Sequence, residues 1–293
     1  MDPCNRTILR RVCLLLAASA LVRPVLAGDV ACASPQPLNS AMGTGATNGC
    51  TYIDNNFVNF NAGSPAGSGD ASWPAVASGF DPRIEFTASG TAPSPFTLDF
   101  RTTGQTISNT ACHANSWCVL GSTSTAETAS QDISYDAQTT ARYYGIILTE
   151  GTVQGSSLLA GDVIMTEEQF CVGAASFNCT TGSSNYGYLE ITETSKSSGG
   201  YTTVFTVCTP GASGCTVSHP TAASISFAST QTEIGIEDTV TISTVSGQAR
   251  TVYIDSFDND FMDAPEPSTL VLFGTALAGL GLLRRRRHCV SRA

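Results

Sequence analysis

The stretch VTISTVSGQARTVYIDSF, residues 240–257, decides the fold class of this chain. Residues 240–245 and 249–257 are rich in Val, Ile, Thr and Tyr and alternate apolar with polar side chains, which is the period of a half-buried β-strand. Between the two runs, Ser246, Gly247 and Gln248 form a break of the length that joins antiparallel strands. We therefore predict two strands connected by a hairpin loop.

Runs of the same kind recur through residues 28–264, where no helical period is sustained over three turns. Gly, Ser, Pro and Asn separate them, as is usual between strands. The further expected strands cover residues 83–89, 96–101, 142–149, 162–166, 188–194, 201–208, 224–229 and 233–237. About ten strands at this spacing predict an all-β ectodomain over residues 28–263, with the architecture of a β-sandwich or jelly roll.

Two details of this ectodomain follow from side-chain pattern. In residues 96–101, Leu98 and Phe100 are expected on one face of the strand, and Thr97 and Asp99 on the other. Residues 121–140 contain few large apolar side chains, so we predict a long loop there.

The charges are unevenly distributed along the 293 residues. The formal net charge is -10, and the isoelectric point is about 4.6. Residues 28–264 hold five basic and 22 acidic residues, a net charge of -17, whereas the other nine basic residues lie near the two ends. The acidic body argues against nucleic-acid binding, and the apolar content of 42% argues against disorder.

Residues 1–27 have the order of a secretory signal peptide. Arg6, Arg10 and Arg11 precede the apolar run VCLLLAASALV at residues 12–22, and small or neutral residues follow at 25–27. The run is too short to anchor the chain in a membrane. We expect signal peptidase to remove this segment after Ala27, and a cut within residues 31–33 is the alternative.

Residues 264–288 form a tail of three parts, which the short segment 289–293 follows. The tail begins with Pro265, Glu266 and Pro267, continues with an uncharged run at 268–283, and ends with Arg284, Arg285, Arg286 and Arg287. A helix over the run would cover roughly 24 Å, less than the ~30 Å hydrocarbon core, which predicts a marginal membrane span. The arginines would stop transfer and hold the C-terminal end of this helix in the cytoplasm.

This tail resembles the PEP-CTERM sorting domain of Gram-negative bacteria that produce exopolysaccharide. The resemblance covers about 30 of the 293 residues and implies that an exosortase, a membrane peptidase, recognises Pro265–Pro267. It further implies that the helix anchors the chain transiently in the inner membrane, and that the cleaved protein reaches the outer surface or the extracellular matrix. An anchor that is never cut is the alternative. The same tail is also labelled as the C-terminal domain of ice-binding proteins.

Eight cysteines lie in the ectodomain, and an even number in an exported protein favours disulfides. Pairing of sequence neighbours predicts Cys32–Cys50, Cys112–Cys118, Cys171–Cys179 and Cys208–Cys215, which is one of many arrangements. Zinc binding is disfavoured because no CxxC motif occurs and the body contains only His113 and His219.

No residue pattern indicates a catalytic centre. The chain has no GxSxG or HExxH motif, and neither His113 nor His219 is placed in a recognisable triad. Carboxylate pairs leave a glycosidase-like arrangement open, the candidates being Glu167–Glu168 and Glu190/Glu193. We expect no catalytic residues, and a carbohydrate-active enzyme is the alternative.

An aspartate run before the tail is the one candidate for a cofactor. Hard oxygen ligands at this spacing favour calcium, although the run does not match an EF-hand loop. The competing interpretation is a solvated strand end and an acidic spacer that keeps the cleavage site accessible. We expect no cofactor, with calcium as the weaker alternative at Asp255, Asp258, Asp260 and Asp263.

The function expected from these features is that of a secreted or surface-displayed structural or adhesive protein of a biofilm or exopolysaccharide matrix. A glycan-binding module is an alternative, with sugar contacts through exposed aromatic residues such as Trp73, Trp117, Tyr143 and Tyr144, unless these lie in the core. The acidic body favours neutral sugars or cation-bridged contacts over direct binding of an acidic polymer. Ice binding is a remote alternative because no Thr-rich repeat of fixed period occurs.

Overall fold

In the computed structural model, all described residues lie within Gly28–Ala264. The described residues are 30–33, 35–37, 49–52, 55–62, 66–67, 84–90, 95–102, 117–150, 153–155, 159–218 and 223–263. Every helix or strand within them is a β-strand, which confirms the all-β prediction. The predicted signal peptide, the Pro265–Pro267 motif, the apolar run 268–283 and the arginine cluster lie outside the described residues.

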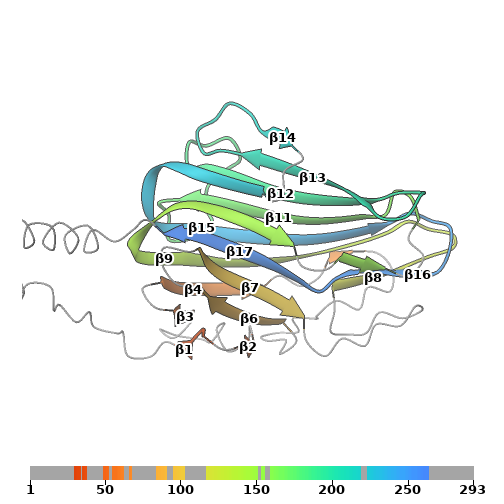
Figure 1. Ribbon diagram of the computed structural model, residues 1–293, viewed down its shortest axis with the longest axis horizontal. Helices are drawn as coiled ribbons and strands as arrows, with labels where there is room; N and C mark the ends of the chain where they lie inside the picture. Colours follow the sequence, from red (N-terminus) through yellow and green to blue (C-terminus); the bar gives the residue numbers. More distant parts are fainter. Residues whose placement is uncertain are drawn as a thin grey trace, which may run out of the picture. The chain divides into compact units, whose positions relative to one another are not determined.

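Fourteen of the strands form one sheet, and three form a smaller one (Figure 1). The large sheet contains β1 (Val30–Ala31), β2 (Gln36–Pro37), β3 (Gly49–Tyr52), β4 (Asn55–Ala62), β5 (Ala66–Gly67), β6 (Ile84–Ser89), β7 (Phe96–Thr102), β9 (Glu127–Glu150), β11 (Val163–Val172), β12 (Tyr186–Ser195), β13 (Tyr201–Cys208), β14 (Thr216–Ser218), β15 (Ala223–Thr244) and β17 (Ser256–Asp263). The small sheet contains β8 (Trp117–Gly121), β10 (Val153–Gly155) and β16 (Arg250–Ile254).

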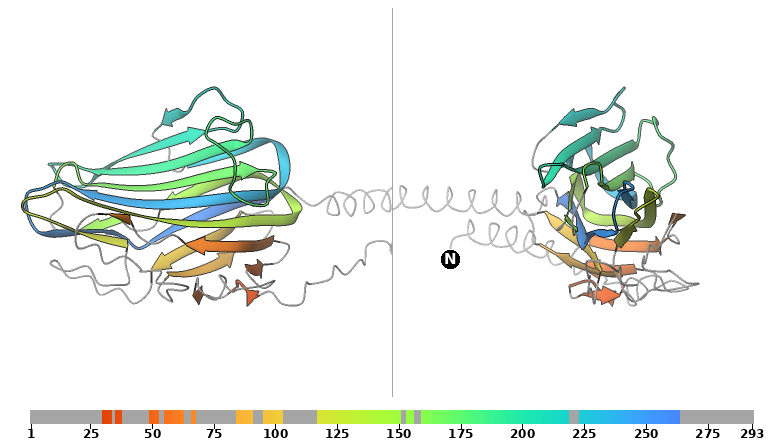
Figure 2. Two further views of the ribbon diagram at one scale, coloured as in Figure 1. Left: turned by 180° about the vertical axis from the view of Figure 1, so that it is seen from behind. Right: turned by 90° about the vertical axis from the view of Figure 1, so that its right-hand side faces the viewer.

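Two long strands, β9 and β15, connect the two layers of the large sheet. In one layer, residues 127–138 of β9 pair with residues 233–244 of β15 and also with β4. In the other layer, residues 143–150 of β9 pair with residues 223–226 of β15 and also with β17. The register between β9 and β15 shifts twice between Ser226 and Glu233, as expected where paired strands bend. One continuous sheet therefore folds over itself (Figure 2).

The hydrophobic core lies between these layers. Phe57 of β4 packs on Phe261 of β17 with ring centroids 5.5 Å apart, and Phe60 of β4 lies 6.5 Å from Phe100 of β7. Because β4 does not pair with β7 or β17, these contacts are made across the core and not along the sheet. The two layers pack face to face, as in a β-sandwich, but both belong to one sheet.

Several predicted strands are present with small changes at their ends. Residues 83–89, 96–101, 188–194 and 201–208 correspond to β6, β7, β12 and β13, and 162–166 forms the first part of the longer β11. Leu98 and Phe100 are buried while Thr97 and Asp99 are partly exposed, which confirms their assignment to opposite faces. The predicted runs 224–229, 233–237 and 240–245 merge into the single strand β15.

The loop predicted at residues 121–140 is wrong, because residues 127–140 form the first part of β9. Every second side chain is buried there, including Ala129, Gln131, Ile133, Tyr135 and Ala137. The inward residues are mostly small or polar, so the apolar alternation is weak in the sequence. Strand pairing on both sides holds this segment in the sheet.

The hairpin predicted at Ser246–Gln248 is also wrong. This turn carries the chain from β15 in the large sheet to β16 in the small one, so that β15 pairs with β9 and β11 while β16 pairs with β8 and β10. Arg250, at the start of β16, is fully buried and bonded to Asp162. The predicted strand 249–257 is likewise divided at Asp255 into β16 and β17.

Candidate functional site

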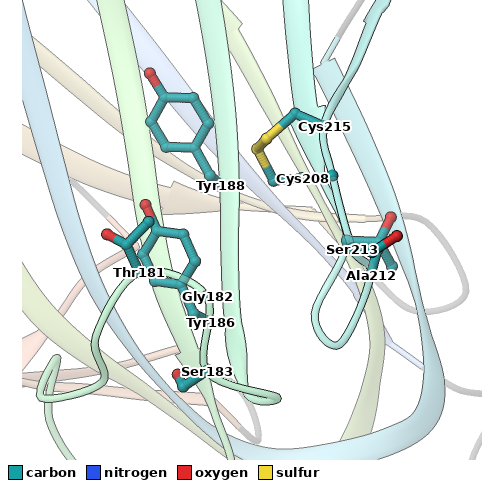
Figure 3. A pocket seen from close by; sticks show the side chains of 11 residues that line it. Thr181, Gly182, Ser183, Tyr186, Tyr188, Cys208, Ala212, Ser213 and Cys215 are labelled. Carbon is teal, nitrogen blue, oxygen red and sulfur yellow. A yellow bond between two sulfur atoms is a disulfide. The ribbon is translucent and has the colours of Figure 1, made fainter.

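A cavity of about 350 Å³ lies beside β12, on the sheet face that points away from the core. Its walls are Tyr186 and Tyr188, the turn 181–183 and the loop 208–215. Figure 3 shows the two tyrosine rings on one side of the cavity, and the Cys208–Cys215 disulfide with Ser213 on the other. The size and the aromatic lining are those of a small-ligand site.

The sequence of β12 places both rings on this face. Tyr186 and Tyr188 are two residues apart and partly exposed, whereas Gly187 and Leu189 between and after them are buried. A side chain at residue 187 would collide with the ring of Phe170 on β11, since an added Cβ would lie 2.2 Å from its Cζ. The glycine therefore lets β12 pack tightly on the core and hold both rings outward.

A disulfide fixes the opposite wall. Cys208 ends β13 and Cys215 precedes β14, and their Cα atoms lie 4.2 Å apart. Within this loop the backbone N–H of Ala212 donates to the carbonyl of Thr209 at 3.0 Å. The crosslink limits the conformations of the wall, which reduces the entropy lost when a ligand is bound.

Two carboxylates border the tyrosines. Glu167 of β11 and Glu190 of β12 stand directly opposite each other, and the Tyr188 hydroxyl lies 2.5 Å from the Oε1 of Glu167 and 2.5 Å from the Oε2 of Glu190. The hydroxyls of Thr192 and Thr206 donate to the Oε1 of Glu190 at 2.7 and 3.2 Å. The Tyr188 hydroxyl thus links the two carboxyl groups, and the two threonine hydroxyls hold Glu190 in place.

Burial and these contacts shift the pKa values of Glu167 and Tyr188. Burial raises the pKa of Glu167, and repulsion by Glu190 and Asp132 adds to it, while the hydrogen bond from Tyr188 opposes it. Burial, together with hydrogen bonds to the two carboxylates, raises the pKa of Tyr188. Because a phenol has one proton and two close acceptors, a proton on Glu167 allows both contacts at once.

The carboxylate pairs predicted from the sequence are not formed. Glu167 and Glu168 are consecutive on β11 and point to opposite faces, and Glu190 and Glu193, three residues apart on β12, do the same. The structure instead brings Glu167 to Glu190, and the phenol of Tyr188 contacts the oxygens of both.

Two of the four aromatic residues proposed from the sequence as sugar contacts lie in the core. Trp117 and Tyr143 are fully buried, and their polar atoms donate to Gln131 at 2.9 Å and to Asn55 at 2.7 Å. Tyr144 is 38% exposed, and Trp73 lies outside the described residues. The alternation in YGYLEIT, residues 186–192, was the signal that could have identified Tyr186 and Tyr188.

Beyond the ectodomain, residues 263–287 match the family described as the PEP-CTERM protein-sorting motif. The chain carries a PEP-CTERM sorting motif. The motif indicates exosortase-dependent sorting to the cell surface or the extracellular space, as the resemblance of the tail predicts. A search of curated proteins found no match to the chain. Across the described residues, no helix has the length and apolar character needed to cross a membrane.

The aspartates that precede the sorting motif belong to a central strand. Asp258 and Asp260 lie on β17, which pairs with β7 and β9, and Asp255 immediately precedes it. Burial raises the pKa of Asp258 and of Asp260, and repulsion from Asp260 adds to the shift of Asp258. Of the interpretation as a solvated strand end and an acidic spacer, the strand part agrees with β17, whereas the spacer part is wrong for Ser256–Asp263, because these residues lie in the strand and Phe257–Phe261 is paired on both sides. No group of three or more His, Cys, Asp or Glu residues suited to a metal is found in the described part of the chain.

The disulfide framework follows the predicted order along the chain. Cys32–Cys50, Cys171–Cys179 and Cys208–Cys215 are formed, with Cα atoms 5.4, 5.7 and 4.2 Å apart. Cys118 is also disulfide-bonded. Its predicted partner Cys112 lies outside the described residues, as do His113 and His219.

Proposed function

We propose that this chain is a surface-displayed or extracellular protein that binds a neutral glycan beside Tyr186 and Tyr188. In this role it serves as a structural or adhesive part of a biofilm or exopolysaccharide matrix. The observation that carries the proposal is the cavity with two tyrosine rings on one wall and a disulfide-fixed loop on the other.

The route to the surface begins with removal of residues 1–27 by signal peptidase. The apolar run 268–283 and the cluster Arg284–Arg287 then hold the chain in the inner membrane until exosortase acts at Pro265–Pro267. The sorting motif supports this order of events. Cleavage would release an ectodomain without the basic ends.

The chemistry of the cavity suits a sugar. The apolar CH face of a pyranose ring stacks on an aromatic ring, and sugar hydroxyls bond to polar groups beside it. Tyr186 and Tyr188 offer two ring faces, and the hydroxyl of Tyr186 already donates to Gln169 at 3.2 Å. Serine and threonine side chains of the loop and turn complete the polar lining.

Charge narrows the ligand to neutral sugars. Residues 28–264 carry a net charge of -17, and the carboxyl groups of Glu167 and Glu190 contact the hydroxyl of Tyr188, which lines the cavity. An anionic polymer would be repelled by this surface at low ionic strength. We therefore expect hexose or pentose units without carboxylate or sulfate groups.

A glycan array with the exported protein tests this proposal. The expected result is retention on neutral glycans, with binding about tenfold weaker in Tyr186→Ala, because a ring contact contributes about 1 kcal/mol. Tyr144→Ala is the matched control, since Tyr144 is a partly exposed tyrosine outside the cavity lining. Absence of any neutral ligand, or equal loss in the two variants, would show that the cavity does not bind sugars.

Sorting is tested separately. Replacing Pro265, Glu266 and Pro267 by alanine should keep the chain in its longer form in the inner membrane, as followed through an epitope in the ectodomain. If the variant reaches the same location at the same size as the unaltered chain, exosortase processing at this motif is refuted.

We further propose that the protein binds its glycan without turning it over. The phenol between Glu167 and Glu190 supports this, because both carboxyl groups are engaged within the protein. A panel of glycoside substrates checks it, and release of reducing sugar that Glu167→Gln abolishes would favour a hydrolase instead. Ice binding is not favoured, since Thr239 on the same face bonds to Asp132 and lies between acidic neighbours.

A further inference from the structure

Two carboxyl groups face each other inside the core, away from the cavity. Glu168 of β11 and Asp238 of β15 are directly paired across the two strands. Both side chains point to the core face, with 0% and 1% of their surface exposed. Neighbouring carboxyl groups at such depth require a partner, because burial of an uncompensated charge is strongly unfavourable.

Asn259 and Tyr135 close this group. The amide Nδ2 of Asn259 donates to the hydroxyl of Tyr135 at 2.6 Å and to the Oδ2 of Asp238 at 2.8 Å. Asn259 comes from β17 and Tyr135 from β9, so the cluster draws side chains from four strands. Because both hydrogen bonds use the nitrogen, the Oδ1 of Asn259 remains available.

Four oxygens of this cluster have no hydrogen-bond partner. They are both carboxyl oxygens of Glu168, the Oδ1 of Asp238 and the Oδ1 of Asn259. In the described part of the chain, Arg250 is the one basic side chain that is buried, and it is bonded to Asp162. The cluster thus presents oxygen acceptors, and no basic side chain in the described part of the chain is available to balance a charge on its carboxyl groups.

We propose that Glu168, Asp238 and Asn259 bind one calcium ion in the core of the ectodomain. A single divalent cation neutralises both carboxylates and engages all four oxygens. A proton shared between Glu168 and Asp238 would engage one oxygen of each and leave the others unbonded. Every donor is a carboxylate or amide oxygen, the set that calcium prefers, and water fills its remaining positions. Magnesium is less suited, because it demands near-ideal octahedral geometry and gives up its hydration shell reluctantly.

Although Asn259 lies within residues 255–263, the site uses none of the aspartates of that run and is independent of glycan binding. Asp258 and Asp260 alternate along β17 with the buried Phe257, Asn259 and Phe261, so they lie on the other face of that strand. The ligands come from β11, β15 and β17. One ion therefore ties together strands from both layers of the sheet, and its binding is coupled to folding.

The test begins with the metal content of the exported protein, purified without chelator. Elemental analysis should find about one calcium per chain, and chelation should lower the melting temperature by about 5–10 °C, as expected for removal of a ligand held at about 100 times its Kd. Added calcium should restore the melting temperature, and equal magnesium should restore less of it.

The decisive variant is the isosteric double substitution Glu168→Gln/Asp238→Asn. It should bind no calcium and melt at the same temperature with and without chelator, while Asp258→Asn, on the other face of β17, should respond as the unaltered protein does. If the double variant does not fold, Glu168→Gln alone should weaken calcium binding at least about tenfold, since one charged ligand is lost. The proposal is overturned if the unaltered protein holds no calcium and ignores chelator, or if the double variant keeps both the metal and the response. If the purified parent protein contains no metal and the double variant is more stable than it, a proton shared between Glu168 and Asp238 balances the pair instead of calcium.

Discussion

Breaking the buried ion pair between Arg250 and Asp162 should strongly destabilise the ectodomain. Both side chains are 0% exposed. The Nε of Arg250 donates to the Oδ2 of Asp162 at 2.8 Å, and its NH2 group bonds to the Oδ1. The guanidinium also donates to the carbonyls of Gln248 at 2.8 Å and Val245 at 2.6 Å. This pair joins the start of β16 in the small sheet to the start of β11 in the large one.

The magnitude follows from what each substitution leaves behind. Arg250→Met removes the cation, so that Asp162 retains only the backbone N–H groups of Leu159 and Val245, each at 3.0 Å. An uncompensated buried carboxylate costs about 3–5 kcal/mol of the free energy of unfolding. Asp162→Asn should cost a similar amount, because it leaves Arg250 without its counter-charge. The double variant contains no buried charge at this point, so its loss should be at least about 2 kcal/mol smaller than the sum of the single losses.

Urea unfolding followed by fluorescence measures these differences, with the fully buried Trp117 as a reporter. Arg101→Met is the matched control, because the Arg101–Asp99 ion pair has an arginine side chain that is 51% exposed. That substitution should cost less than about 1 kcal/mol. The reasoning is refuted if Arg250→Met costs no more than Arg101→Met, or if the two single losses at the buried pair simply add.

Three further predictions concern the core and the crosslinks. Burial raises the pKa of Glu150 from 4.5 to about 8, so the folded chain binds a proton that the unfolded chain releases. The free energy of unfolding should therefore fall as pH rises from about 4.5 to about 8. Urea unfolding at several pH values should show a smaller fall in Glu150→Gln. If the free energy of unfolding depends on pH equally in the variant and the parent, the pKa of Glu150 is not raised. Gly187→Ala should cost about 1–3 kcal/mol through overpacking against Phe170, and a melting temperature equal to that of the parent would exclude the collision. Replacing Cys171 and Cys179 together by serine should lower the free energy of unfolding, measured with denaturant, by about 2–3 kcal/mol. A loss below about 0.5 kcal/mol would mean that the segment between these two residues is ordered without the disulfide.

The parts of the fold that depend on nearby residues could be predicted. Strands such as β7 and β13 have a clear alternation of side chains, and their positions follow from it. The pairs Cys171–Cys179 and Cys208–Cys215 join residues seven or eight positions apart, so sequence proximity was sufficient. In contrast, the first part of β9 has small and polar inward residues, and its strand character depends on pairing with β15 and β4.

The candidate sites depend on register between strands that are distant in sequence. Glu167 meets Glu190, and Glu168 meets Asp238, because β11 pairs with β12 on one side and with β15 on the other. A shift of one residue would exchange the two faces of a strand, so local pattern alone cannot select these neighbours. The same limit explains why the Ser246–Gln248 turn was predicted as a hairpin, although its flanking strands enter different sheets.

The sequence by itself determined the all-β class, several strand positions, the neighbouring disulfides and the sorting motif at residues 263–287, because a strand period, a short crosslink and a linear recognition motif are local properties. Tertiary structure alone decided that β9 and β15 bend to form both layers, that Tyr186 and Tyr188 border a cavity, and that Glu168, Asp238 and Asn259 bury four oxygens without hydrogen-bond partners. These features arise from contacts between residues far apart in the sequence, in one case more than a hundred positions. The free energy of such contacts is gained only when the whole sheet has assembled.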